Sequence, residues 1–259
     1  MDYENISSKD NSKIKNLKKL KQKKYRESMG KFFVENLVII SDALTAGFKF
    51  DYIFLTKDFI LKNKEAVKKI LDKCGDDQVF IITSEVNKSF SNLENPSGVC
   101  ALYSKSDNGD IDINEPIVYL NSIGDPGNLG TILRSALAFG LKNIVLDETC
   151  ADLYNHKTIN AAKDSIFKLN ILEDENLEIL KNIKQEMPII STQLEKSKDL
   201  NILDKLEKFC IVLGDESNGV DKKIQKLEDQ FVKIKMSKDI ESLNVASAAA
   251  IIFYKIYNK

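Results

Sequence analysis

The segment from Val245 to Tyr254 carries no charged side chain, although 30% of the chain is charged. Four of its ten residues are alanine, which has the highest helix propensity, and Ser242 or Asn244 ahead of it can cap a helix. A helix that is apolar on every side must be covered on most of its surface. The sequence therefore predicts a buried C-terminal helix over 244–257 behind a polar cap.

Short apolar runs alternate with helix-like segments in the first 105 residues. Residues 1–8 are mostly polar, and we expect them to be disordered. Strands are expected at 31–34, 51–55, 78–82 and 98–103, and helices at 35–46, 58–73 and 84–92, after a Lys-rich amphipathic helix within 9–31. This alternation predicts a small α/β domain over residues 1–105, followed by a polar linker at 106–115.

Residues 116–259 show the same alternation and predict a second α/β domain. Strands are expected at 117–120, 143–147, 189–192, 209–213 and 231–234, and helices at 131–139, 153–163, 175–186, 221–226 and 244–257. Because helices separate the strands, we expect a mainly parallel sheet that is covered on both faces.

Charge is distributed unevenly along the chain. The net charge of −1, taken alone, argues against a nucleic-acid partner. Between Lys9 and Lys31, however, there are ten basic residues and two acidic ones, whereas the remainder holds 28 basic and 37 acidic residues. The basic segment is either a solvated helix face or a surface that binds RNA phosphates. Its candidate RNA-binding residues are Lys18, Lys19, Lys23, Lys24 and Arg26.

Cysteine spacing and hydropathy exclude several classes of protein. The four cysteines lie far apart without a CxxC pair, so we expect reduced thiols and no metal site. The N-terminus has no apolar signal segment, and no apolar run is long enough for a membrane span. We therefore expect a cytoplasmic protein without a membrane partner.

A glycine-rich stretch at 124–130 joins an expected strand to an expected helix, and we expect it to be a flexible loop. Exposed N–H groups at such a helix start attract anions, but an ordinary tight turn has a similar composition. A dinucleotide-binding loop, and with it an oxidoreductase, is a further alternative because Asp147 ends the next strand. The G-x-x-G-x-x-G spacing and the donor that Pro126 lacks argue against that alternative.

Three segments, taken in order, resemble the signature motifs of one enzyme family. They are 125–134 (DPGNLGTILR), 211–220 (IVLGDESNGV) and 242–244 (SLN). Together they resemble the SpoU/TrmH-type RNA ribose 2′-O-methyltransferases of the SPOUT superfamily, over nearly the whole chain. The first domain is similar to the family's L30e-like substrate-binding domain at 33–35 (FVE) and 95–99 (NPSGV). Asn36 stands where that domain usually has glycine, and asparagine is the best substitute for glycine if that turn needs a positive φ.

The resemblance implies a trefoil knot in the second domain, S-adenosylmethionine as the cofactor, and a homodimer packed through the small-residue face of the C-terminal helix, including Ala249. The residues that match the family's catalytic positions are Asn128, Arg134, Glu216, Ser242 and Asn244. Those that match its cofactor-lining positions are Thr192, Leu213, Gly214, Ile234, Met236 and Leu243. A side chain added at Gly214 is expected to collide with the cofactor.

Without the resemblance, these residues could have purely structural roles. Arg134 and Glu216 suit an ordinary ion pair, and Ile234 and Leu243 suit a plain core. The resemblance implies instead S-adenosylmethionine-dependent methylation of a ribose 2′-OH in ribosomal (23S) RNA, with tRNA methylation or non-catalytic RNA binding as alternatives. Removing a proton from an ordinary arginine near pH 7 costs ~7–9 kcal/mol, so we expect Arg134 to orient and stabilise the 2′-oxygen and not to act as a base.

Overall fold

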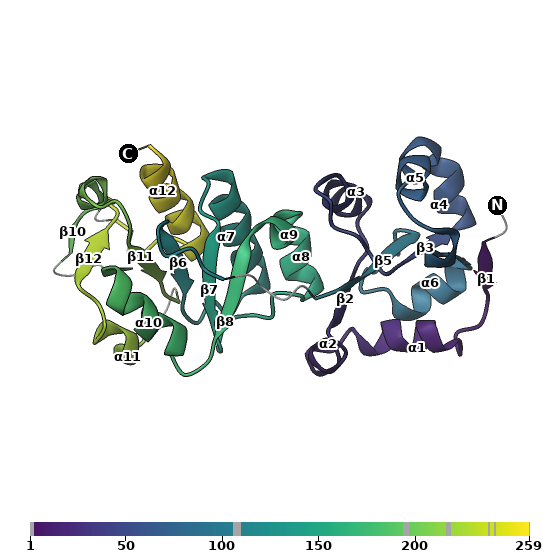
Figure 1. The fold of residues 1–259 in the computed structure, drawn as a ribbon, viewed down its shortest axis with the longest axis horizontal. Helices are drawn as coiled ribbons and strands as arrows, with labels where there is room; N and C mark the ends of the chain where they lie inside the picture. Colours follow the sequence, from purple (N-terminus) through teal and green to yellow (C-terminus); the bar gives the residue numbers. More distant parts are fainter. Residues whose placement is uncertain are drawn as a thin grey trace. The chain divides into compact units, whose positions relative to one another are not determined.

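The computed structural model describes residues 3–105, 110–193, 197–215, 219–237, 239–240 and 242–258 (Figure 1). The chain divides into two compact units. The first comprises Met1–Asp107 together with Tyr154–Asn160, and the second comprises Asn108–Leu153 together with Ala161–Lys259. Each unit has its own sheet and its own apolar core.

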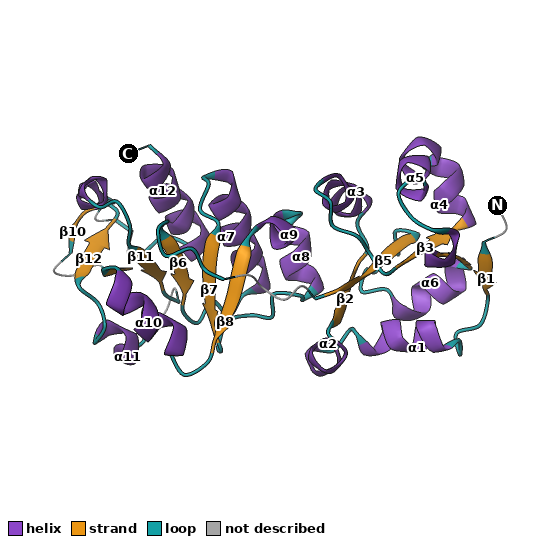
Figure 2. Ribbon diagram, viewed as in Figure 1, coloured by secondary structure: helices purple, strands orange, loops and turns teal. Residues whose placement is uncertain are grey.

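The first unit contains a mixed sheet of five described strands in the order β1-β4-β3-β5-β2. These strands are β1 (Glu4–Ile6), β2 (Lys31–Val34), β3 (Tyr52–Thr56), β4 (Val79–Ile82) and β5 (Val99–Ser104). The described helices are α1 (Ser12–Lys19), α2 (Lys23–Met29), α3 (Leu37–Thr45), α4 (Lys57–Lys62), α5 (Lys64–Leu71), α6 (Ser84–Phe90) and the short 3-10 helix η1 (Asp76–Gln78). Buried residues of α1 and α6 form the core on one face of the sheet, and Figure 2 shows α3 and α5 on the other side.

Two local features of the first unit differ from the sequence-based expectation, and a third, at Asn36, answers a question that the sequence left open. Residues 4–6, expected to be disordered, form β1, which pairs in parallel with β4 and buries Ile6. The Lys-rich segment forms two helices, α1 and α2, instead of one. Asn36 has a φ of −122°, so this turn needs no positive φ, and the side chain of Asn36 caps α3 by accepting hydrogen bonds from the N–H groups of Val38 and Ile39.

The second unit contains a sheet of seven described strands in the order β10-β12-β9-β11-β6-β7-β8, and every pair is parallel. The strands are β6 (Ile117–Leu120), β7 (Asn143–Asp147), β8 (Asn170–Asp174), β9 (Ile189–Thr192), β10 (Lys198–Asp199), β11 (Cys210–Leu213) and β12 (Gln230–Lys233). The described helices of this unit are α7 (Pro126–Ala138), α9 (Ser165–Lys168), α10 (Glu178–Glu186), α11 (Lys222–Gln225), α12 (Val245–Tyr257) and the 3-10 helix η2 (Leu200–Lys205). Helix α8 (His156–Ala162) begins within Tyr154–Asn160 of the first unit and ends in the second unit.

Helices cover both faces of this second sheet. The buried residues of α10 and α11 pack on one face, and α7 and α12 pack against each other on the opposite side (Figure 2). This arrangement confirms the predicted α/β class with a mainly parallel sheet, while the trefoil knot stays a prediction. Strand β8 was not predicted because only two of its five residues, Ile171 and Leu172, are apolar.

Helix α7 begins five residues earlier than expected, at Pro126. The side chain of Asp125 accepts a hydrogen bond from the N–H of Asn128 at 2.7 Å and so caps the helix. Proline suits the first helical position, because its missing N–H would have no partner within the helix. Most of the glycine-rich stretch is therefore the first turns of α7 and not the flexible loop that we expected.

The predicted C-terminal helix is present as α12, which is capped by Asn244. Ala249 and Phe253 are fully buried within the second unit, where α12 contacts α7 and η2. The opposite side of α12 exposes apolar side chains, among them Tyr254. The helix is thus covered on one side only. Within the described residues, no helix combines the length and the apolar character needed to cross a membrane.

Candidate active site

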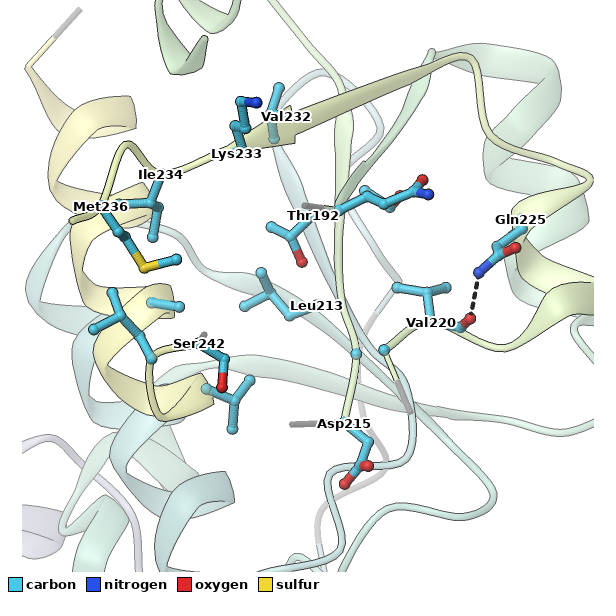
Figure 3. Close-up of a pocket in the computed structure, with 17 residues that line it drawn as sticks. Thr192, Leu213, Asp215, Val220, Gln225, Val232, Lys233, Ile234, Met236 and Ser242 are labelled. Carbon is cyan, nitrogen blue, oxygen red and sulfur yellow. Dashed lines mark hydrogen bonds between the residues drawn. The ribbon is translucent and has the colours of Figure 1, made fainter. Parts of the chain in front are cut away.

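A cavity of about 440 Å³ opens in the second unit where the carboxyl ends of β9, β11 and β12 meet the start of α12 (Figure 3). Ligands bind at the carboxyl edge of parallel sheets in many proteins, and volumes of about 300–1,000 Å³ are typical of small-molecule sites. Much of the wall is apolar and comes from several separate segments. Its apolar side chains include Leu213, Val220, Val232, Ile234, Leu243 and Val245.

All six residues that match the family's cofactor-lining positions lie around this one cavity. Thr192 is the last residue of β9, Leu213 is the last residue of β11, and Gly214 comes directly after it. Ile234 and Met236 lie in the segment after β12. Leu243, just before α12, completes the set. Figure 3 shows the side chains of Thr192, Leu213, Ile234 and Met236 around a common space. The fold therefore brings together residues that span 52 positions of the sequence.

The backbone of Gly219 and Val220 leaves room only for glycine at position 214. A Cβ atom at this position would lie 2.4 Å from the carbonyl carbon of Gly219 and 2.6 Å from the backbone nitrogen of Val220. Real Cβ atoms do not approach backbone this closely, so any side chain would force the segment apart. A side chain at position 214 would therefore collide with the protein's own backbone, whether or not a cofactor is bound.

The first and third motifs meet through two asparagines. The side-chain amide of Asn244 donates a hydrogen bond to Oδ1 of Asn128 at 3.0 Å, across 116 positions of sequence. The other end of the Asn244 side chain caps α12 by accepting hydrogen bonds from the N–H groups of Ala246 and Ser247. Ser242 lines the cavity beside them. Asn244 therefore ties the start of α12 to the start of α7.

The sequence pattern of the SpoU rRNA Methylase family matches residues 115–254, which is more than half of the chain. The chain belongs to this family. Residues 11–101 match the MRM3-like substrate binding domain, so the two matches together span both units. The predicted resemblance to SpoU-type methyltransferases is thereby confirmed.

Full-length relatives support this family assignment. The chain is 27% identical over 252 residues to the 23S rRNA (guanosine(2553)-2′-O)-methyltransferase RlmP of Bacillus subtilis, covering 97% of this chain and 98% of the relative. A crystal structure of an RNA 2′-O ribose methyltransferase matches with a TM-score of 0.80 and 26% identity, over 98% of each chain. An AdoMet-bound rRNA methyltransferase of Sinorhizobium meliloti matches in fold, with a TM-score of 0.83, 24% identity, and coverage of 99% and 98%.

The remaining SpoU motif residues are placed less completely. Arg134 lies on α7 with an exposed side chain and is not one of the residues that line the cavity. Glu216 lies outside the described residues, so its pairing with Arg134 stays a prediction. The described neighbours of Glu216, Asp215 and Gly219, line the cavity.

Several cavity residues were missed by the sequence analysis. Asp215 lies inside the second motif, but its side chain was not assigned a role. Lys233 and Gln225 belong to no motif, and Gln225 donates a hydrogen bond to the carbonyl oxygen of Val220 at 2.8 Å (Figure 3). Only the folding of the chain brings these side chains to the cavity.

A buried carboxyl group lies next to the cavity wall. Ser191, which lines the cavity, is 1% exposed, and its hydroxyl lies near Glu228. Both carboxyl oxygens of Glu228 are buried, and neither makes a well-formed hydrogen bond with a described residue. Burial raises the pKa of Glu228 above its ordinary value, and the Ser191 hydroxyl offsets only part of that shift.

The predicted RNA-binding lysines lie on the first unit, on or beside α1 and α2. Lys19 and Lys24 are exposed beside the ring of Tyr25, with Nζ atoms 5.9 Å and 4.8 Å from its centroid. Lys23 is exposed and lies 3.6 Å from Glu27. The fourth lysine, Lys18, donates a hydrogen bond to the carbonyl oxygen of Lys9. Lys18, Lys19, Lys23 and Lys24 therefore stay candidates for RNA contacts.

Arg26 differs from these lysines. It is only 7% exposed, and its guanidinium donates a hydrogen bond to the carbonyl oxygen of Leu20 at 2.6 Å. Leu20 is the C-cap residue of α1, and carbonyl groups at the C-terminal end of a helix lack partners within the helix. Arg26 thus joins α1 to α2, and its burial removes it from the RNA-binding set that the sequence suggested.

Proposed function

We propose that the protein transfers a methyl group from S-adenosylmethionine to a ribose 2′-OH of ribosomal RNA. The observation that carries this proposal is the meeting of the described parts of all three SpoU motifs. Gly214 and Leu243 line one cavity, and Asn244 is hydrogen-bonded to Asn128 beside it. Methylation of 23S rRNA is the activity named for RlmP, a relative that matches nearly the whole chain.

The cavity fits S-adenosylmethionine in size and chemistry. Apolar side chains such as Leu213, Ile234 and Leu243 offer surfaces for a flat adenine ring, and Asp215 supplies negative charge for a cationic ligand. These residues, with Thr192 and the backbone at Gly214, would hold the cofactor. When bound, S-adenosylmethionine supplies a reactive methyl group on a positively charged sulfur.

The protein has to place the ribose oxygen in line with that methyl group and to handle one proton. Asn128 and Asn244 hold the starts of α7 and α12 in one arrangement through their hydrogen bond. Arg134, on α7, orients the 2′-oxygen and stabilises the negative charge that develops on it, and Glu216 holds the guanidinium. Ser242 is close enough to the cavity to contact the ribose.

The first unit supplies RNA affinity in this proposal. The exposed lysines of α1 and α2 neutralise phosphates and release counterions. Transfer RNA is the alternative substrate, because phosphate contacts position an RNA without reading its sequence. The substrate-binding domain that matches residues 11–101 supports a structured RNA in either case.

The working form is a homodimer packed through α12. Ile251, Tyr254 and Tyr257 on this helix are 42%, 59% and 65% exposed, and the rings of both tyrosines contact Phe139 of α7. Exposed apolar clusters of this kind mark interaction surfaces. Ala249, which we expected in the interface, is instead fully buried within its own unit. The contact is therefore made by the opposite side of the helix.

Mapping of 2′-O-methyl groups tests the proposed function. In cells that lack the protein, one or a few ribose methyl groups should disappear from ribosomal RNA and return when the gene is restored. Loss of a tRNA methyl group would identify the alternative substrate. An unchanged methylation map, with RNA binding retained, would leave the chain as an RNA-binding protein without this activity.

A further inference from the structure

Asn121, directly after β6, connects the two ends of the segment that carries the second motif. Its backbone N–H donates a hydrogen bond to the carbonyl oxygen of Leu213 at 2.9 Å. Its side-chain Oδ1 accepts a hydrogen bond from the N–H of Asp221 at 2.8 Å. Between these two bonds lies the segment 214–220, whose described residues Gly214 and Val220 line the cavity. One asparagine thus fixes the start and the end of this segment.

Asp147, at the end of β7, fixes the side chain of Asn121 by a hydrogen bond. The amide of Asn121 donates a hydrogen bond to Oδ2 of Asp147, and the N–H of Ser122 lies 3.1 Å from both carboxyl oxygens. Thr149 adds its backbone N–H and its hydroxyl to Oδ1 of Asp147, at 3.0 Å and 2.8 Å. Asn121 and Asp147 are 3% and 8% exposed. The carboxylate therefore has several donors in a buried site, which such a charge requires.

The same residues also hold the chain just ahead of α7. Ser122 has a φ of 58°, in the left-handed region that residues other than glycine rarely adopt. Its N–H bonds to Asp147 hold it in that conformation. Three residues later, Asp125 caps α7, which carries Asn128 and Arg134. The direction in which the chain enters α7 thus depends on the Asn121–Asp147 pair.

We propose that Asn121 and Asp147 form a clamp that positions the cavity-lining residues Gly214 and Val220 and the start of α7 relative to each other. This inference rests on the proposed function, since it assigns the pair a role in cofactor binding and methyl transfer. Neither residue lines the cavity, so both are positioning residues. A pair that only stabilised the fold would affect the melting temperature and leave the affinity of the folded protein unchanged.

Exchange of the two side chains provides the sharpest test. In Asn121→Asp a carboxylate oxygen can still accept from the N–H of Asp221, but two buried carboxylates now face each other, and their repulsion weakens that bond. In Asp147→Asn one oxygen remains for Ser122 and Thr149, so the damage is smaller. The double variant Asn121→Asp with Asp147→Asn restores an amide-to-carboxylate hydrogen bond in the reverse direction. The clamp therefore predicts a severe loss of S-adenosylmethionine affinity in Asn121→Asp and a mild loss in Asp147→Asn. It predicts a recovery of affinity in the double variant.

Asn143 provides a matched control. It is 1% exposed, lies at the opposite end of β7, and hydrogen-bonds to Asp112 and Asn170 away from the cavity. Asn143→Asp makes the same chemical change in the same sheet. It should lower the melting temperature of the protein while leaving cofactor affinity within about twofold, because distant sites act independently.

The experiment measures S-adenosylmethionine affinity by calorimetry on the full chain, with hydrogen exchange of segment 213–221 as a second readout. Asn121→Asp should weaken binding by about tenfold or more and speed exchange at Asp221. The double variant should regain affinity to within about fivefold of the wild type. A folded Asn121→Asp protein with unchanged affinity, or a double variant no better than the single one, would overturn the clamp. Failure of the wild type to bind the cofactor would instead overturn the proposed function.

Discussion

Single polar residues near the cavity act mainly by fixing backbone segments. Asn244 shares its side chain between the cap of α12 and Asn128, and Asp125 caps α7. Gly214 is needed because the backbone of Gly219 leaves no room for a Cβ atom. Changes at these positions therefore alter the shape of the cavity before they alter any direct contact with a ligand. A larger residue at position 214 would strain the backbone of its own segment. A loss of cofactor affinity in such a variant would therefore not show that the cofactor lies beside Gly214.

Glu228 gives a prediction at the scale of one residue. Burial raises the pKa of its carboxyl group in the folded protein. The folded state therefore holds this proton more tightly than the unfolded chain, and stability is lost as the pH rises through the folded pKa. Glu228→Gln removes that loss, so the variant should be more stable than the wild type at pH 8, with a smaller difference near pH 4.5. Denaturant unfolding at the two pH values measures this difference.

The exposed residue Glu186 supplies the control for this measurement. Glu186→Gln should change the free energy of unfolding by less than ~0.5 kcal/mol at both pH values, as is usual for surface substitutions. If the difference between Glu228→Gln and the wild type is the same at pH 8 and pH 4.5, then the burial of this carboxylate is not what costs stability.

At the scale of elements, the apolar runs of β6, β7, β9 and β11 were predictable because nearly every residue of these strands is buried. Expected and observed strands agree within one residue for β6, β7, β9, β11 and β12. The misses have local causes. The start of α7 was hidden because glycine and proline suggest a loop, yet proline suits a first turn. The three-residue β1 and the two-residue β10 are too short to show a pattern.

The two sides of α12 give a prediction at this scale. Tyr254 is 59% exposed and Ala249 is fully buried. Tyr254→Arg should yield folded monomers at micromolar concentration, because a charge would have to be desolvated in the proposed interface. Ala249→Arg should instead unfold the second unit, because it overfills a packed core. Sedimentation and circular dichroism separate the two results.

Leu61, exposed in the first unit, serves as the control for a new surface arginine. Leu61→Arg should leave the sedimentation coefficient unchanged. A wild-type protein that sediments as a monomer, or a Tyr254→Arg protein that stays dimeric, would rule out an interface through this side of α12.

At the scale of the whole molecule, the chain combines a methyltransferase unit with a unit that offers basic helices. The sequence predicted this combination through its motifs and its concentration of lysine, and the two family matches span the same regions. The roles of single residues were harder to predict. Arg26 lies in the basic run but is buried, and Gln225 lies in no motif but reaches the cavity. Burial and long-range proximity are properties of the folded chain that local patterns do not contain.

The lysines of the first unit give a prediction for the whole protein on RNA. The triple variant Lys19→Ser, Lys23→Ser and Lys24→Ser should weaken RNA binding and reduce its dependence on salt. The slope of log affinity against log salt should fall by up to about 0.7–0.9 for each lost phosphate contact. Fluorescence anisotropy over a range of salt concentrations measures this slope.

A matched triple variant at Lys62, Lys64 and Lys69 removes the same charge from the exposed surface of α4 and α5. It should leave the slope near that of the wild type. Equal effects of the two triple variants would mean that net charge alone drives RNA binding, and that the helices α1 and α2 have no special part in it.

The central claim is that this protein methylates a ribose oxygen of RNA with the help of Arg134, and one assay tests it most directly. Purified wild-type and Arg134→Ala proteins are given labelled S-adenosylmethionine and ribosomal RNA from cells that lack the protein. The wild type should place label on a ribose 2′-oxygen, which makes the adjacent phosphodiester resistant to alkali. Arg134→Ala should lose at least about a hundredfold in rate, the scale of one electrostatic stabiliser, with nearly unchanged cofactor affinity. Label on a base, or near-normal turnover by a folded Arg134→Ala protein, would contradict the account.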